Sequence, residues 1–173
     1  MEEQFEKMLN AGKDIKISNI IKLIISIFIC LFAGFLGSVF TTPAIPTWYA
    51  ALTKPSFTPP GWLFFPVWTA LFIIMGISVY LIWQRGIEDH QVKTALGIFA
   101  AQLILNVLWS AAFFGLRSPL AGLIDISILW IFIVVTIIYF MKVSRTAGLL
   151  LIPYILWVSF AAVLNFLIWR LNI

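Results

Sequence analysis

Charged side chains are scarce in this sequence. They make up 10% of its 173 residues, whereas apolar residues make up 62% and the mean hydropathy is +1.07. A soluble domain usually carries about 25% charged residues, so too few polar groups are present to cover a water-facing surface. This scarcity excludes an ordinary soluble protein and predicts a single domain whose surface is covered by lipid.

Cysteine, histidine and clustered positive charge are lacking as well. The one cysteine, Cys30, lies in an apolar run, which excludes an intramolecular disulfide and a cysteine-cluster metal site. The one histidine, His90, lies in a link between apolar runs, and we expect it to be solvated. The net charge is only +4, and Lys and Arg lie mostly near the ends of the apolar runs. We therefore expect no metal and no nucleic-acid partner.

Five apolar runs are each long enough to cross a bilayer, which takes about 20 residues of helix. They cover residues 20–41, 61–84, 94–115, 119–141 and 146–169. All links but the first are short, so successive helices are antiparallel neighbours. The sequence therefore predicts an all-α membrane protein, a five-transmembrane-helix bundle formed by residues 20–173. We expect residues 1–19 to be a polar N-terminal extension, either a solvated tail or a short surface helix.

The positions of Lys and Arg predict the orientation. Eight of them lie on the N-terminal side of the bundle: Lys7, Lys13, Lys16, Lys22, Arg85, Lys93, Lys142 and Arg145. On the other side are Lys54, Arg117 and Arg170. Positively charged loops stay in the cytoplasm, so we expect a cytoplasmic N-terminus, an outer C-terminus and an outward-facing link 42–60.

A few polar side chains interrupt the apolar spans. They are Gln102, Asn106, Asp125 and Asn165. Polar groups inside a membrane are costly and usually face the bundle interior, and a rise of about 1.5 Å per residue puts all but Gln102 in the outer half. For Asp125 we expect an ion pair with Arg117 or Arg170; a proton relay or a ligand contact is the alternative.

Helical spacing joins these polar residues to aromatic residues on single faces. The third span carries Gln102, Asn106, Trp109 and Phe113; the fifth carries Tyr154, Trp157, Ala161 and Asn165; and the second carries Phe64 or Phe65, Trp68 and Phe72. Such stripes arise from ordinary core packing, or they wall a pocket with aromatic sides and a few orienting polar groups. Both interpretations remain open from the sequence.

The link 42–60 (TPAIPTWYAALTKPSFTPP) holds five of the eight prolines. Proline fixes φ and stiffens an extended chain, so we predict a shaped lid over the outer half, with no regular helix beyond one turn near residues 47–52. An interfacial anchor formed by Trp48 and Tyr49 is the alternative. Thr58 is expected to cap the second helix.

Small residues recur four apart on two spans. The pairs are Ala33 with Gly37, Gly34 with Ser38, and Gly97 with Ala101. Such pairs allow close helix contact in lipid, either within one chain or between two copies, so a homodimer is one prediction.

Several motifs resemble those of the TspO/MBR family, the translocator proteins that include the peripheral-type benzodiazepine receptor. The runs WYAALTKPSFTPPGW (48–62) and PVWTALF (66–72) are the most specific. Asn106 with Trp109 and FFG (113–115), then LID (123–125), and PY (153–154) with Trp157, FA (160–161) and LN (164–165), follow in the family's order. The resemblance covers about residues 20–170 and points to a prokaryotic-type member.

The resemblance implies a five-helix bundle, often dimeric, that binds tetrapyrroles such as protoporphyrin IX and related hydrophobic ligands. The family's pocket positions correspond to Tyr49, Trp68, Asn106, Trp109, Trp157 and Ala161, to which the stripe on the fifth span adds Tyr154. Trp68 and Trp157 match two tryptophans implicated in light-dependent porphyrin degradation by some bacterial members. Lys54 is the nearest cation in the lid for the propionates of such a ligand.

We therefore expect a multi-pass protein of a prokaryotic cell membrane that acts as a receptor for tetrapyrroles. Porphyrin would be its ligand, no cofactor is required, and regulation of porphyrin levels or of a stress response is its expected role. A light-dependent porphyrin-degrading enzyme and a transporter of lipophilic molecules are the alternatives. No nucleophile–base pair is present, so we expect no conventional catalysis.

Overall fold

The computed structural model describes the backbone of residues 2–173 and the side chains of residues 17–173. Within that range every regular element is helical. The elements are α1 (Glu2–Ala44), the π-helical turn η1 (Ile45–Tyr49), the 3-10 turn η2 (Gly61–Leu63), α2 (Phe64–Trp83), α3 (His90–Ser110), the π-helical turn η3 (Ala111–Gly115), α4 (Pro119–Val143), α5 (Arg145–Leu150) and α6 (Ile152–Leu171).

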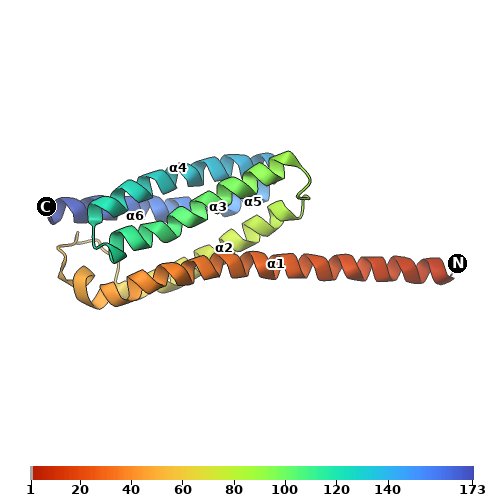
Figure 1. Ribbon diagram of the computed structural model, residues 1–173, viewed down its shortest axis with the longest axis horizontal. Coiled ribbons are helices and arrows are strands. Elements are labelled where there is room, and N and C mark those ends of the chain that lie inside the picture. Colours follow the sequence, from red (N-terminus) through yellow and green to blue (C-terminus); the bar gives the residue numbers. More distant parts are fainter. Residues whose placement is uncertain (1) are drawn as a thin grey trace.

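Five helical stretches are long and apolar enough to cross a membrane. They are Ile17–Tyr49, Gly61–Trp83, His90–Gly115, Pro119–Val143 and Arg145–Leu171. They form one elongated bundle in which the two termini lie at opposite ends (Figure 1). The predicted all-α, five-helix membrane fold is confirmed. Which end faces the cytoplasm stays a prediction.

Helix α1 is much longer than the other helices and projects past the bundle at its N-terminal end (Figure 1). It begins at Glu2, so the polar extension continues the first span in one helix. Residues 2–11 are mostly strong helix formers such as Glu, Gln, Lys, Met and Leu, which favours this continuity.

The prolines of the first link do not end α1, contrary to our prediction. The helix includes Pro43 and continues through η1, which contains Pro46; only about residues 52–60 form an irregular strap. Proline lacks an amide hydrogen and frees a carbonyl in the preceding turn. Here the Oγ1 atom of Thr47 donates to the Pro43 carbonyl at 2.8 Å, and the helix loosens locally to π geometry. Both adjustments are usual for proline in membrane helices.

Two other helix boundaries differ from the predicted ones. Helix α3 begins at His90 rather than Thr94, because Asp89 precedes it as an N-cap whose Oδ1 accepts from the Gln91 amide at 2.7 Å. His90 is therefore the first residue of a helix and not part of the link. The fifth span is divided at Leu151 into α5 and α6, and Pro153 occupies the first turn of α6, where its missing amide is tolerated.

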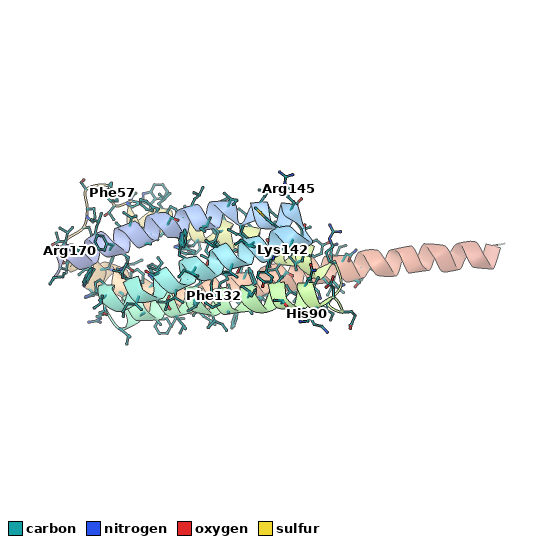
Figure 2. All side chains as sticks on the ribbon, turned by 90° about the horizontal axis from the view of Figure 1, so that it is seen from above. Phe57, His90, Phe132, Lys142, Arg145 and Arg170 are labelled. Atoms are coloured by element: carbon teal, nitrogen blue, oxygen red, sulfur yellow. The ribbon has the colours of Figure 1, made fainter. Side chains whose placement is uncertain are left out.

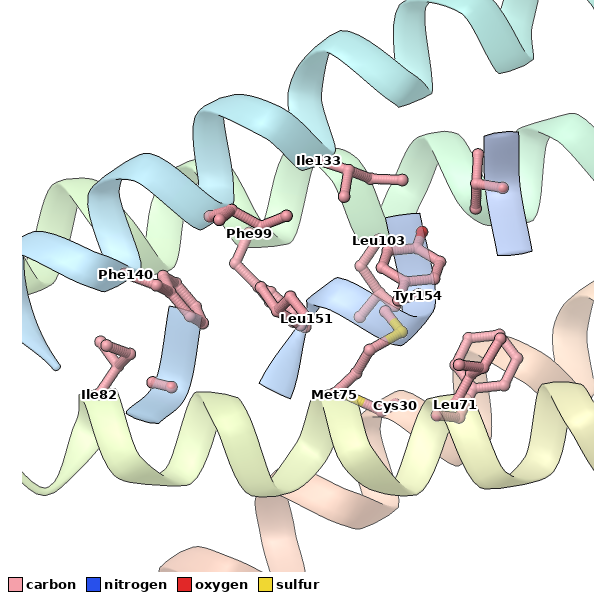
Figure 3. Packing of buried hydrophobic residues seen from close by; sticks show 14 of the residues in the cluster. Cys30, Leu71, Met75, Ile82, Phe99, Leu103, Ile133, Phe140, Leu151 and Tyr154 are labelled. Carbon is pink, nitrogen blue, oxygen red and sulfur yellow. The ribbon is translucent and has the colours of Figure 1, made fainter. Parts of the chain in front are cut away.

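The half of the bundle near the α2–α3 link is tightly filled. Its core contains Met75, Ile82, Phe99, Phe140 and Leu151, which come from α2, α3, α4 and the α5–α6 junction (Figure 3). Each of these side chains is at most 4% exposed. Close packing of this kind holds the helices in fixed positions.

Glycines bring α1 and α2 together. A Cβ added at Gly76 would lie 2.5 Å from the Cα of Ile27, and one at Gly34 would lie 2.5 Å from the ring of Phe72. The small residues of α1 therefore serve packing within the chain. Gly97 on α3 has no atom within 4 Å of such a Cβ. The predicted homodimer stays a prediction.

Candidate ligand-binding site

A cavity of about 410 Å³ lies in the other half of the bundle, between α1, α2, α3, η3 and α6. Its size falls within the range of about 300–1,000 Å³ typical of small-molecule sites. Aromatic residues of α2, α3 and η3 form much of its lining, and two amides, Asn106 and Asn165, interrupt the apolar surface.

Aromatic rings of α2, α3 and η3 form one wall of the cavity. The Trp68 ring lies 5.7 Å from Phe72 and 6.5 Å from Trp109 between centroids, with 30° between the planes in each pair. Trp109 in turn lies 5.6 Å from Phe113 with an interplanar angle of 25°. Offset, moderately inclined rings of this kind attract one another, which helps to hold the wall in place; Trp68 and Trp109 are its partly exposed members.

A buried hydrogen-bond chain fixes the first amide. The Nδ2 atom of Asn106 donates to the Tyr154 hydroxyl at 3.0 Å, and that hydroxyl donates to Oε1 of Gln102 at 2.9 Å. Tyr154 is fully buried, and Asn106 is 5% exposed. Buried polar groups need such partners, and here the partners hold the Asn106 amide at the cavity surface.

The second amide joins three helical segments. Oδ1 of Asn165 accepts from the Trp109 indole Nε1 at 3.2 Å, and Nδ2 of Asn165 donates to the Pro119 carbonyl at 2.7 Å. Asn165 on α6 therefore orients an indole of the wall and attaches the start of α4. This hydrogen bonding holds α3, α6 and the start of α4 in fixed relative positions beside the cavity.

The helical segment that follows α1, residues 45–51, covers one end of the cavity. The Tyr49 ring lies 5.6 Å from the Phe114 ring, and the Trp48 ring lies 5.5 Å from Phe113. Lys54 stabilises this end: its Nζ atom donates to the carbonyls of Tyr49 at 2.7 Å and Leu52 at 2.8 Å. Lys54 therefore caps a helix end, a role not expected from the sequence.

The strap 52–60 is tied to the end of α6. The Thr53 amide donates to Oδ1 of Asn172 at 3.0 Å, and Nδ2 of Asn172 donates back to the Thr53 carbonyl at 2.9 Å. Phe57 adds a ring contact of 6.3 Å to Phe160. Thr58 donates to the Pro55 carbonyl at 2.7 Å and closes a turn, so the predicted cap of the second helix is wrong.

The cavity also opens sideways between α1 and α2. Its rim includes Phe35 on α1 and Phe65 on α2, which are 62% and 79% exposed. Both side chains lie on the surface that a bilayer would cover. The site therefore has an apolar opening toward lipid as well as a roof of aromatic residues.

A family model for the TspO/MBR family matches residues 26–170 of the chain. The chain belongs to the TspO/MBR family. The tryptophan-rich protein TspO of Chlorobaculum tepidum is 52% identical over 88% of this chain and 97% of its own length. A protein of the same name from Archaeoglobus fulgidus is 50% identical over 89% and 99%, and the translocator protein of Homo sapiens is 37% identical over 80% and 82%.

Five of the seven residues that the sequence suggested for the site of this TspO/MBR protein line the cavity. They are Tyr49, Trp68, Asn106, Trp109 and Ala161. Tyr154 lies behind Asn106 and supports it through its hydroxyl. Trp157 does not line the cavity; its ring packs 6.1 Å from Phe64 and 5.6 Å from Phe160.

The contribution of α1 was missed by sequence reasoning. Gly34 and Gly37 line the cavity beside Thr41, and a Cβ on Gly37 would come within 3.0 Å of the Ser110 hydroxyl. The signal was present in the small-residue pairs, which we interpreted only as helix contacts. Side chains in their place would fill part of the cavity, so the glycines also shape the site.

The predicted ion pair of Asp125 is wrong for the part of the chain whose side chains are described. Its Oδ2 atom is buried without a hydrogen-bond partner, and Arg117 and Arg170 are exposed. Arg170 lies at the extreme end of the bundle (Figure 2), whereas Asp125 lies almost two turns inside α4. Asp125 does not line the cavity either.

Proposed function

We propose that this TspO/MBR protein is a membrane receptor that binds tetrapyrroles of the protoporphyrin IX type in the cavity. The observation that carries the proposal is the aromatic wall of the cavity, in which Trp68 and Trp109 are partly exposed and are backed by the buried rings of Phe72 and Phe113. A porphyrin is a flat π system, and such a system stacks favourably on offset aromatic faces.

The remaining chemistry of the cavity also supports a mostly apolar ligand with a few polar groups. Asn106 supplies an amide held in place by Tyr154, and the hydroxyls of Thr41 and Ser110 lie on the lining. A few placed polar groups in an apolar pocket orient a ligand. The opening between α1 and α2 would admit a lipophilic ligand from the bilayer.

We further propose that the protein lies in a prokaryotic cell membrane with its N-terminus in the cytoplasm. The described end that carries Lys22, Arg85, Lys93, Lys142 and Arg145 is then the cytoplasmic one. In this orientation the cavity lies in the outer half of the membrane. The high identity to proteins from two prokaryotes supports the choice of host membrane.

The decisive experiment titrates the purified protein with protoporphyrin IX in the dark and follows quenching of tryptophan fluorescence. We expect saturable binding that Trp68→Leu weakens about tenfold, because a stacking surface is lost. Trp130→Phe is the matched control: Trp130 lies outside the cavity, 40% exposed, and donates to Ser159. Absence of saturable binding, or equal weakening by both variants, would contradict the proposal.

Light-dependent degradation of the porphyrin is the second candidate function, favoured by the position of Trp68 in the wall itself. Trp157 lies one ring further back, in contact with Phe64. If the indoles take part chemically, illumination of the complex converts the pigment, and the Trp68→Phe/Trp157→Phe variant binds it without converting it. Binding in the dark with no spectral change in light would exclude degradation and would support the receptor function only.

Transport is distinguished from both functions by flux of the porphyrin into proteoliposomes. Uptake that depends on Trp68 and Asn106 would support a translocating role, as the name of the human relative suggests for that protein. Binding without flux would support the receptor.

A further inference from the structure

A second hollow lies at the opposite end of the bundle from the ligand cavity. It is a groove of about 400 Å³ between the described beginning of the first span and the C-terminal end of α2. Its lining consists of Ile17, Ser18, Ile21, Lys22, Ile25 and Trp83. None of these residues contributes to the cavity described above.

We propose that this groove binds an anionic phospholipid, with the phosphate group on Lys22 and an acyl chain along the isoleucines. The proposal is independent of the porphyrin-binding function, because it concerns other residues at the other end of the molecule.

The isoleucines form the apolar part of the site. Ile17, Ile21 and Ile25 recur at four-residue spacing, which places them on one face of α1. They are 48%, 50% and 39% exposed. Helix α1 runs past the end of the bundle here (Figure 1), so this face lies alongside Trp83 and is partly exposed among the residues whose side chains are described. An acyl chain would cover it.

Lys22 forms the charged part of the site. Its Nζ atom lies 5.8 Å from the centroid of the Trp83 ring, an arrangement that holds the ammonium group over the groove. Of the acidic groups in the nearby α2–α3 link, Asp89 is already engaged as the N-cap of α3. An ammonium group beside a tryptophan at the end of a membrane span lies at the depth of lipid headgroups.

The surroundings favour an anionic over a zwitterionic lipid. Among residues 17–173, the same end of the bundle carries Arg85, Lys93, Lys142 and Arg145 against Glu88 and Asp89, a net positive set (Figure 2 labels Lys142 and Arg145). Basic pockets between helices on the cytoplasmic side are suited to anionic headgroups. A soluble phosphate would use Lys22 but would leave the isoleucine face uncovered, so a lipid fits both parts.

The test is native mass spectrometry of the full chain with phosphatidylglycerol and, separately, phosphatidylcholine of the same acyl chains. We expect one phosphatidylglycerol to be retained in preference to phosphatidylcholine. Lys22→Gln should weaken this binding about fivefold, the effect of one basic residue near an anionic lipid, and Lys22→Arg should preserve it. The matched control is Lys142→Gln, since Lys142 also lies over a ring, 4.9 Å from that of Tyr139, at the same end but outside the groove.

Three results would overturn the proposal. Equal retention of both lipids would remove the role of the charge, and equal loss in the Lys22 and Lys142 variants would reduce it to general electrostatics. Competition by glycerol 3-phosphate would assign the site to a soluble anion. Thermal unfolding of each variant shows whether it folds. Ile21→Trp is a second test of lipid binding: its bulky side chain should displace the acyl chain and weaken phosphatidylglycerol retention although Lys22 remains.

Discussion

The half of the bundle near the α2–α3 link, around Met75 and Phe140, is filled by side chains (the filled half), whereas the opposite half, around Trp68 and Trp109, surrounds a cavity (the cavity half). Glycines allow close helix contact in both halves, as at Gly76 with Ile27 and at Gly34 with Phe72. Around the cavity, the side-chain hydrogen bonds of Asn106, Tyr154 and Asn165 add to these contacts. An open site in a small membrane bundle thus depends on polar connections that keep its walls in place and on a packed half that keeps its helices aligned.

Opening a void in the filled half should have the largest effect on stability. Phe140 is fully buried and stacks 5.7 Å from Phe99. Phe140→Ala should lower the free energy of unfolding by about 3–5 kcal/mol, because packing contacts are lost and a cavity remains. Phe28→Ala is the matched control, since Phe28 is 65% exposed on the lipid side. Thermal and chemical unfolding in detergent would measure both, and similar losses would show that the stability of the bundle does not depend on the buried packing around Phe140.

Adding a single methyl group to the α1–α2 contact should have the next largest effect. Gly76→Ala would place its Cβ 2.5 Å from the Cα of Ile27. Because backbone atoms cannot rotate away, the helices must separate, at a cost of about 1–3 kcal/mol. Gly97→Ala, which meets no atom within 4 Å, should keep the unfolding temperature or raise it slightly, because alanine favours the helix. A stable Gly76→Ala protein would show that this contact is loose.

Removing the hydroxyl of Tyr154 tests the buried hydrogen bonds beside the cavity. Tyr154→Phe would leave Nδ2 of Asn106 and Oε1 of Gln102 without their partner. We expect a loss of about 1–2 kcal/mol in stability and weaker porphyrin binding, because Asn106 is no longer held. Tyr139→Phe is the control, since Tyr139 lies outside the cavity. Unchanged porphyrin binding by the Tyr154 variant would show that the hydrogen-bond chain does not contribute to ligand binding.

Releasing the strap should have the smallest effect on stability. Asn172→Ala removes both bonds to Thr53, which are exposed, at a cost of about 0.5–1.5 kcal/mol. Hydrogen exchange at the Thr53 amide should accelerate, while exchange of the amides in the half of the bundle near the α2–α3 link stays the same. Asn172→Asp keeps an acceptor for that amide and should give an intermediate rate. If exchange is unchanged, other contacts hold the strap.

The spans and much of the site were predictable from sequence, since both follow from side-chain chemistry at regular spacing. Trp68, Asn106 and Trp109 lie on the cavity as their helical stripes suggested. What spacing does not determine is which side chain of a neighbouring helix covers a residue on the face that points toward the cavity. On α6, Ala161 reaches the cavity, whereas Trp157, one turn away, packs against Phe64 behind the wall.

The continuation of α1 through two prolines depends on details that composition does not reveal. A hydroxyl at Thr47, a π-helical turn and the capping ammonium of Lys54 together keep the chain helical to about residue 51. The error in the predicted ion pair of Asp125 has a comparable origin. The sequence places two arginines on the same side of the membrane as Asp125 but does not give their distances from its carboxylate.

The reciprocal hydrogen bonds between Thr53 and Asn172 have a practical consequence for handling the protein. Asn172 lies one residue before Ile173, so an affinity tag or fluorescent protein attached after Ile173 would lie beside the residue that secures the strap. A fusion at the other terminus would be separated from the strap by the whole length of α1 (Figure 1). Binding constants measured with tags at the two ends should therefore differ, and the N-terminal fusion is the one to use for ligand measurements.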